Sequence, residues 1–336
     1  MDPVSHAVIG RAIAAAVRPG EARARGVAAA AILGSLSPDV DFVLMPVGWD
    51  VYLRAHVIGT HSVAGALVTG LGSAVLIRAC VPLRGRRRFG ETATGGRSAM
   101  GPLATAAVLA ALSHLLADIA AGARLRPAWP FSEAIVSAPL VAMGDPWTIA
   151  VLIVGAVLLW RWRTTPARAA RTALLTLCVF LGLKGVLYMQ ALSAVAADSR
   201  IDRSSRILEA RWASLTEWSV FDRSPSSLRH WRVSVRRQAP LLVLAIDRHP
   251  ESPLVERSRE LQSVKNFLAV HELGFAREEP HGLERDVMWS DIRYCWREAS
   301  ATDVQCALWF GGVFDAGGRA TMQEVRVGSW IQRRAP

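Results

Sequence analysis

The sequence predicts a membrane-embedded all-α bundle of about four to six hydrophobic helices, followed by a small soluble α+β domain. The chain has 336 residues, of which 51% are hydrophobic and 20% charged, and its mean hydropathy is +0.26. That value is high for a soluble protein of this length. Long apolar runs fill the first 197 residues, whereas charged residues and short alternating segments dominate from about Asp198 onward.

Six apolar runs define the predicted bundle. Four of them offer the roughly 20 residues that a membrane-spanning helix requires, namely Ser62–Pro82, Met100–Ala121, Ala134–Trp160 and Thr172–Ala197. Two shorter runs, Val4–Val17 and Gly26–Ser37, precede them and could either be extended or be buried inside the bundle. Met1-Asp2-Pro3 is acidic and His6 interrupts the first run, so we expect no cleaved signal peptide and a protein retained in the membrane.

Arginine placement predicts the orientation of the bundle. Twelve arginines fall in the connections 18–25, 84–97 and 161–171, whereas the opposite loops 39–61 and 122–146 contain three. Because cytoplasmic loops are enriched in basic residues, we expect the twelve in the cytoplasm. The N-terminus, the opposite loops and residues 198–336 are then extracytoplasmic. Since the arginines lie between apolar runs and not on one folded face, we expect membrane lipids as partners and no nucleic acid. Lys184, a lone cation within the last run, could line a substrate path or pair with a carboxylate.

The soluble α+β domain is expected over residues 198–336, after an integral membrane domain over residues 1–197. Alternating patterns predict strands at Trp231–Arg237, Leu241–Asp247, Val287–Glu298 and Val304–Phe314, and an apolar face predicts a helix at Glu256–Leu273. Asp291 and Arg293 are expected to form a buried pair in a strand. Cys295 and Cys306 flank a polar turn, so a hairpin would bring them opposite one another, and outside the cytoplasm they could form a disulfide.

Histidine and aspartate side chains mark the expected outer ends of the apolar runs. They begin the first run, end the second, precede the third and occupy the outer end of the fourth. Ionisable groups at membrane depth are costly and usually mark a functional site. The seven candidates are His6, Asp39, Asp41, His56, His61, His114 and Asp118.

The spacing of these residues is typical of metal ligands. His114 and Asp118 are four residues apart and would project from one helical face. Imidazole and carboxylate without thiolate favour zinc, with manganese as the alternative. Seven ligands exceed what one tetrahedral ion needs, so we expect one to three divalent ions. The structural alternatives are helix caps for His6 and the aspartate pair, satisfied loop histidines at His56 and His61, and a simple hydrogen-bonded pair at His114 and Asp118.

Three stretches resemble the YdjM-type family of predicted inner-membrane, metal-dependent hydrolases. They are Ser37-Pro38-Asp39-Val40-Asp41, His56-x-x-x-Thr60-His61-Ser62 and Leu112-Ser113-His114-Leu115-Leu116-Ala117-Asp118, and His6 and Trp129-Pro130 fit the same pattern over about residues 1–135. The resemblance implies that the seven residues form the metal site. More distantly, the His-x-x-x-Asp pattern is similar to zinc-dependent phospholipase C and related zinc nucleases, which implies phosphoester hydrolysis. Two positions depart from the family, because Val57 replaces a usual arginine and Phe42 replaces a frequent histidine.

The expected function is hydrolysis of an ester or phosphoester by a metal-activated water at the outer membrane interface, where a lipid-linked substrate could reach the site. Asp41 or Asp118 could act as the general base, and Thr60 and Ser62 could orient a ligand or the substrate. Two other classes stay open, a metal transporter and a sensor or scaffold with a structural metal. Transporters place ionisable groups near the membrane midplane, whereas these cluster at one end, which favours the enzyme.

Overall fold

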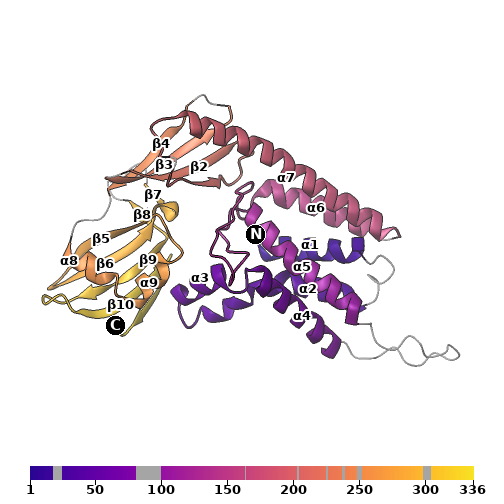
Figure 1. The fold of residues 1–336 in the computed structure, drawn as a ribbon, viewed down its shortest axis with the longest axis horizontal. Coiled ribbons are helices and arrows are strands. Elements are labelled where there is room, and N and C mark those ends of the chain that lie inside the picture. Colours follow the sequence, from indigo (N-terminus) through magenta and orange to yellow (C-terminus); the bar gives the residue numbers. More distant parts are fainter. Residues whose placement is uncertain are drawn as a thin grey trace. The chain divides into compact units, whose positions relative to one another are not determined.

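A computed structural model describes residues 1–17, 25–80, 100–162, 164–202, 204–224, 226–236, 239–247, 252–297 and 304–336 (Figure 1). They form two compact units. The first, residues 1–40, 57–187 and 210–215, is helical, and the second, residues 41–56, 188–209 and 216–336, contains the sheets. A helical region followed by a small sheet-rich domain confirms the predicted fold class. The predicted basic connection 84–97, Arg18, Arg23 and Arg163 lie outside the described residues.

Apolar helices build the first unit: α1 (Pro3–Val17), α2 (Arg25–Leu36), α4 (Val63–Cys80), α5 (Met100–Ala120), α6 (Pro146–Arg161) and most of α7 (Pro166–Ala197). The 3-10 helix η1 (Ser37–Leu44) directly follows α2. Helix α5 packs against α1, α2 and α4. Within the described residues, four segments are long and apolar enough to cross a membrane: Gly26–Leu44, Val63–Cys80, Met100–Ala120 and Pro166–Ala197.

Small side chains allow these helices to approach closely. The shared core of α1, α2, α4 and α5 consists largely of buried alanines such as Ala14 and Ala107. Gly34 of α2 is so close to α5 that a β-carbon at this position would lie 2.4 Å from the Ala107 carbonyl oxygen. Such contacts are typical of helix packing in membranes. Larger apolar side chains, including Val68 of α4 and Leu183 of α7, are exposed on the outside of the helices, where a lipid phase would contact them.

The run Ala134–Trp160 is not a continuous helix, which corrects the prediction. Helix α6 begins only at Pro146, where the Asp145 side chain caps it by accepting from the Thr148 backbone N–H. The preceding residues form an irregular segment that is hydrogen-bonded to the end of α5, for example from Leu140 N to Ala120 O at 2.9 Å. Pro139 and the left-handed Gly144, with φ +63°, oppose a helix here. Conversely, η1 extends the short run Gly26–Ser37 to a 19-residue candidate span.

Lys184 of α7 binds backbone carbonyl groups. Its ammonium group donates to the carbonyl oxygens of Ser214 and Leu215 at 3.2 and 3.0 Å, in the segment 210–215 that belongs to the first unit. The indole of Trp147 donates to Ala213 O at 3.1 Å in the same segment. This cation therefore anchors a connecting segment.

Two main sheets build the second unit (Figure 1). The four-stranded sheet has the order β1-β2-β3-β4, and the five-stranded antiparallel sheet has the order β11-β10-β9-β6-β5. The strands of the first are β1 (Ile207–Ala210), β2 (Glu217–Arg223), β3 (Ser227–Ser234) and β4 (Leu241–Asp247). Those of the second are β5 (Gly274–His281), β6 (Glu284–Asp291), β9 (Leu308–Phe314), β10 (Ala320–Val327) and β11 (Trp330–Arg334).

Three helices accompany these sheets: α3 (Trp49–Ile58, of which residues 49–56 belong to this unit), α8 (Pro253–Ser258) and α9 (Gln262–Leu268). The predicted helix Glu256–Leu273 is wrong as a single element, because α8 and α9 are separate and residues 269–273 belong to neither. Tertiary hydrogen bonds hold the segment on either side of the break. Ser258 Oγ accepts from Trp289 Nε1 at 2.8 Å, and Gln323 Oε1 accepts from the Ser263 backbone N–H at 3.1 Å.

The predicted strands are found with shifted bounds. Leu241–Asp247 coincides with β4, and Trp231–Arg237 overlaps β3. Val287–Glu298 covers the end of β6, the 3-10 helix η2 (Ile292–Tyr294) and β7 (Cys295–Trp296), and Val304–Phe314 covers β8 (Gln305–Cys306) and β9. The predicted pair of Asp291 and Arg293 is present at the end of β6, where Arg293 Nη2 lies 2.8 Å from Asp291 Oδ2.

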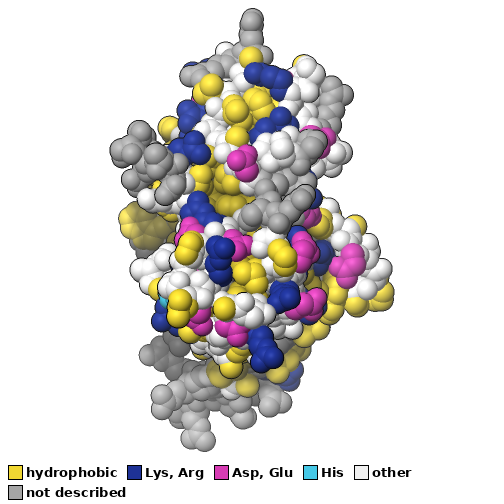
Figure 2. All heavy atoms as spheres, turned by 90° about the vertical axis from the view of Figure 1, so that its left-hand side faces the viewer, with side chains coloured by type: hydrophobic (Ala, Val, Ile, Leu, Met, Phe, Trp, Pro, Cys, Tyr) yellow, Lys and Arg dark blue, Asp and Glu magenta, His cyan; other side chains and the backbone are white. Residues whose placement is uncertain are grey.

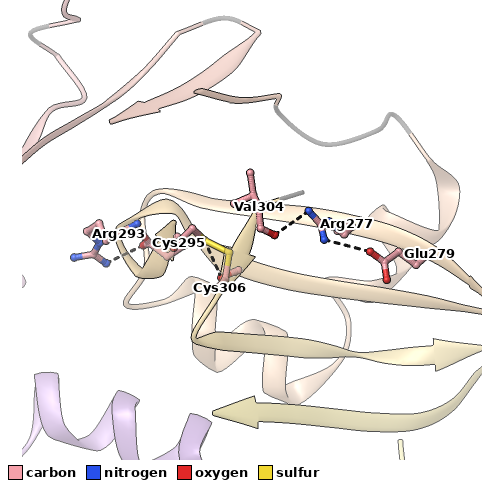
Figure 3. Close-up of a disulfide and its surroundings, with 8 residues drawn as sticks. Arg277, Glu279, Arg293, Cys295, Val304 and Cys306 are labelled. Carbon is pink, nitrogen blue, oxygen red and sulfur yellow. Dashed lines mark hydrogen bonds and ion pairs between the residues drawn. A yellow bond between two sulfur atoms is a disulfide. The ribbon is translucent and has the colours of Figure 1, made fainter. Parts of the chain in front are cut away.

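Cys295 and Cys306 form a disulfide that joins β7 to β8 (Figure 3). The two cysteines are direct register partners in this short antiparallel pair, as the hairpin argument anticipated. The polar turn predicted between them, residues 299–303, lies outside the described residues. The disulfide closes a loop with a sequence separation of 11.

Acidic and basic side chains are intermixed on the face that Figure 2 shows. In the second unit they form ion pairs such as Arg326 Nη2 to Asp286 Oδ2 at 3.3 Å and Arg285 Nε to Glu278 Oε1 at 3.4 Å. Interspersed charges of both signs are typical of a surface in contact with water. This surface contrasts with the exposed apolar side chains of α4 and α7.

Candidate metal centre

Five of the seven candidate residues lie at neighbouring helix ends of the first unit. His6 lies near the start of α1, Asp39 in η1 directly after α2, His61 just before α4, and His114 and Asp118 in the last two turns of α5. Because α1 and α4 begin where α2 and α5 end, antiparallel packing brings these four ends together.

His114 lies at the centre of this cluster. Its Nε2 atom is 3.1 Å from His61 Nε2, 3.2 Å from Asp118 Oδ2 and 3.6 Å from Asp39 Oδ1. Asp118 also contacts His6, with 3.2 Å between Oδ1 and Nε2, and His61, with 3.5 Å between Oδ2 and Nε2. The His6 and His114 rings stack with their centroids 3.7 Å apart.

The cluster is almost closed to solvent. The three histidines are at most 1% exposed and Asp118 is 5% exposed, whereas the Asp39 side chain retains 17% of its surface. The partners of Asp118 are imidazoles and the Met1 amino group, which contacts Oδ1. Buried carboxylates are costly without compensating positive charge. The Met1 ammonium supplies one such charge to Asp118, and Asp39 adds a second carboxylate beside His114, so the cluster is suited to a further cation.

Hydrogen bonding assigns the proton on His114. Its Nδ1 atom lies 2.7 Å from the Ser35 carbonyl oxygen, which can only accept, so Nδ1 carries the proton. In the neutral ring, Nε2 then directs a lone pair at carboxylate oxygens of Asp39 and Asp118. A cation bound among these acceptors would stabilise them. Metal-binding histidines typically donate their other ring N–H to a carbonyl in this manner.

The separations also match those of a metal's ligands. At a Zn–N distance of about 2.1 Å, the ligands of a tetrahedral ion lie about 3.4 Å apart, and the contacts of His114 Nε2 range from 3.1 to 3.6 Å. Within the described part of the chain, the buried His6 Nδ1 has no hydrogen-bond partner. The residues present therefore fit a divalent ion with nitrogen and oxygen ligands.

Asp41 and His56 form a pair of their own in the second unit. His56, in the last turn of α3, places Nδ1 3.1 Å from Asp41 Oδ2. One ligand atom from each of His6, His114 and Asp118, all in the first unit, lies within 4.8 Å of the others, so this group could hold a metal ion.

The residues around these groups were predicted in part. Thr60 Oγ1 lies 3.1 Å from His61 Nδ1, which is the orienting contact that the sequence suggested. Ser62 instead uses its hydroxyl within its own turn, donating to Gly59 O at 2.9 Å and accepting from Gly65 N at 3.0 Å. Sequence reasoning missed the Ser35 carbonyl, since a backbone acceptor has no signature in the side-chain pattern.

A family model described as YdjM inner membrane protein matches residues 1–191. The chain belongs to the YdjM inner membrane protein family. The match contains all seven candidate ligands and ends within α7, before the first strand. Together with the four helices of spanning length, it makes this YdjM-family chain a membrane protein. No curated protein and no solved structure matches it.

Proposed function

We propose that this YdjM-family protein is a membrane-bound, metal-dependent hydrolase that cleaves an ester or phosphoester. The observation that carries the proposal is the cluster around His114, in which three imidazoles and two carboxylates converge in a nearly dry site. Zinc fits this set of nitrogen and oxygen ligands, and manganese is the alternative. We further propose a phosphoester as the substrate, because the His114-x-x-x-Asp118 spacing resembles that of zinc-dependent phospholipase C and zinc nucleases.

A bound divalent ion would supply an activated water and polarise the scissile bond. His6, His61, His114, Asp39 and Asp118 would hold it, with Ser35 and Thr60 keeping two of the imidazoles in their orientation. Asp118 contacts three histidines and is therefore suited to ligation. Asp41, which pairs with His56, is the better candidate for the general base that accepts the water's proton.

We further propose an extracytoplasmic site with a lipid-linked substrate. The Cys295–Cys306 disulfide supports an oxidising compartment for the C-terminal domain, and the arginine distribution supports the same side. In η1, Val40 and Val43 are 52% and 70% exposed beside the candidate aspartates. An apolar surface next to a polar site is suited to a substrate that keeps its acyl or prenyl chain in the bilayer.

The metal content of the detergent-purified protein tests the proposal. We expect about one to three equivalents of zinc or manganese in the wild type and loss of the metal in His114→Ala/Asp118→Ala. The matched control is His281→Ala/Asp286→Ala, which removes a His–Asp pair of the C-terminal sheet whose histidine is exposed and should retain the metal. The metal-loaded protein should then hydrolyse phospholipids in mixed micelles.

Two results would contradict the proposal. A wild type without metal after reconstitution would exclude the metal site and favour a sensor or scaffold. Metal binding without hydrolysis of any ester or phosphoester lipid would favour a structural ion or a transporter.

A further inference from the structure

Helix α3 has two faces with different neighbours in the second unit. One face carries Trp49 and Leu53, which pack against the core between α9 and the five-stranded sheet. The other carries Tyr52 and His56, whose ring centroids lie 5.1 Å apart. Both rings contact Phe42 of η1, at centroid distances of 5.0 and 6.5 Å. The helix thus lies between the C-terminal domain and the segment that carries Asp41.

A buried polar cluster fastens α3 to the C-terminal domain. Asp50 is fully buried, accepts from Asn266 Nδ2 of α9 at 2.7 Å and forms an ion pair with Arg334 of β11. Arg54, one turn later, donates to Asn266 Oδ1 at 3.0 Å. Gly48 leaves the necessary space, since a β-carbon there would lie 2.7 Å from Asp50 Oδ1. We call Asp50, Arg54, Asn266 and Arg334 the α3 clamp.

The clamp buries charged side chains, and their removal from water carries a large desolvation free energy. A buried ion pair often stabilises a fold no more than apolar side chains of the same volume would, and its best-attested use is to fix one particular geometry. Here the helix that is fixed carries His56 six residues beyond Asp50, about 9 Å along the axis. A small tilt at Asp50 would therefore move His56 away from Asp41.

We propose that the α3 clamp positions the Asp41–His56 pair, so that Asn266 and Arg334 of the C-terminal domain are positioning residues for Asp41, the proposed general base. This inference rests on the proposed function. It gives the C-terminal domain a role in the chemistry, because a catalytic carboxylate must be held within about 0.5 Å of its productive position. The family match ends at residue 191, so these two residues lie outside the matched region.

Hydrolysis of phospholipid in mixed micelles by the zinc-loaded, full-length protein tests this role. Asn266→Asp places a second carboxylate against Asp50, and we expect kcat to fall by about 10- to 100-fold, while the zinc affinity, measured against a competing chelator, stays that of the wild type. The exchanged variant Asp50→Asn/Asn266→Asp restores one amide and one carboxylate at the contact and should recover kcat. The matched control is Asp222→Asn, which removes a buried carboxylate paired with Arg229 in the four-stranded sheet and should keep the kcat of the wild type.

Hydrogen exchange of the metal-free protein supplies a second readout. We expect faster exchange over residues 49–58 in Asn266→Asp but not in Asp222→Asn. Unchanged kcat and exchange in Asn266→Asp would overturn the positioning role and leave the proposed hydrolase intact. An equal loss of kcat in Asp222→Asn would also overturn it, since any damage to the domain would then suffice. A wild type that binds no zinc, or that binds zinc without hydrolysing the substrate, would instead overturn the proposed function and the inference that rests on it.

Discussion

His114 shows how one hydrogen bond can define the chemistry of a side chain. The Ser35 carbonyl can accept only from Nδ1–H, and this leaves Nε2 as the atom that meets Asp118, Asp39 and His61. A histidine at the same position without this carbonyl could present either nitrogen. The ligand character of His114 therefore depends on the backbone of α2, although the residue itself is on α5.

A buried cluster of His271, Asp291 and Arg293 makes the C-terminal domain sensitive to acid. Burial of the His271 imidazole lowers its pKa from the ordinary value of 6.5. Burial alone would raise the pKa of Asp291, but the Arg293 guanidinium outweighs it and holds that pKa well below its usual range. Both groups bind fewer protons in the folded than in the unfolded chain, so stability falls as the pH drops below about 6.5 and again below about 3.9.

We expect Asp291→Ala to lower the free energy of unfolding by about 3–5 kcal/mol, because it leaves the buried Arg293 guanidinium without its closest carboxylate. Denaturant unfolding at pH 7 followed by tryptophan fluorescence measures this loss. Glu279→Ala, which breaks the solvent-accessible pair with Arg277 (Figure 3), is the control and should change stability little. Equal stability of Asp291→Ala and the wild type would contradict the importance of the buried pair.

At the scale of elements, the close approach of α2 and α5 has a direct consequence. Gly34→Ala would place a β-carbon 2.4 Å from the Ala107 carbonyl oxygen, and the neighbouring Ser35 holds His114. We expect a loss of about 1–3 kcal/mol from overpacking, which exceeds the helix-propensity gain of up to about 1 kcal/mol. The thermal unfolding midpoint in detergent should fall, and bound metal should decrease with it.

Gly72→Ala is the matched control for this prediction. Nothing lies within 4 Å of a β-carbon at Gly72 of α4, so the same substitution should preserve or slightly raise the midpoint. A midpoint for Gly34→Ala at or above that of Gly72→Ala would show that α2 and α5 can separate without cost.

At the scale of the whole molecule, the proposed orientation is open to direct measurement. In a background without the free and exposed cysteines Cys80 and Cys178, Leu283→Cys should react with a membrane-impermeant maleimide in intact cells. Leu283 is 96% exposed on the C-terminal domain. Arg88→Cys, in the arginine-rich connection 84–97, should react only after permeabilisation, because basic connections stay in the cytoplasm. The reverse labelling pattern would refute the extracytoplasmic domain and site.

Much of this molecule could be predicted from local sequence. A run of about 20 apolar residues has a favourable transfer free energy into lipid. This criterion predicted a membrane-spanning helix at Met100–Ala121, and the structure has the helix at Met100–Ala120. The alternation of runs placed His6, Asp39, His61, His114 and Asp118 at the same end of the bundle, and the structure brings them into contact. Helix ends can be matched in this way because neighbouring helices of a bundle run antiparallel.

Hydropathy alone was insufficient where apolar residues do not form a helix. Ala134–Trp160 is apolar enough to be read as a span, yet hydrogen bonds to the end of α5 hold the residues before Pro146 in an irregular path. The helix Glu256–Leu273 is divided in a similar way, beside contacts of Ser258 with Trp289 and of Ser263 with Gln323. In both cases the tertiary partners outweigh the local helix periodicity.

Composition and the alternation of apolar runs are enough to predict the membrane class of the protein, the candidate ligands and the end of the bundle where they meet. The folded chain is needed to show which nitrogen of His114 faces the site, and which residues hold Asp50. The Asp50–Arg334 pair joins residues 284 positions apart, and no local pattern records such a contact. Its geometry depends on packing energies that many distant side chains share, and these become defined only when the chain has folded.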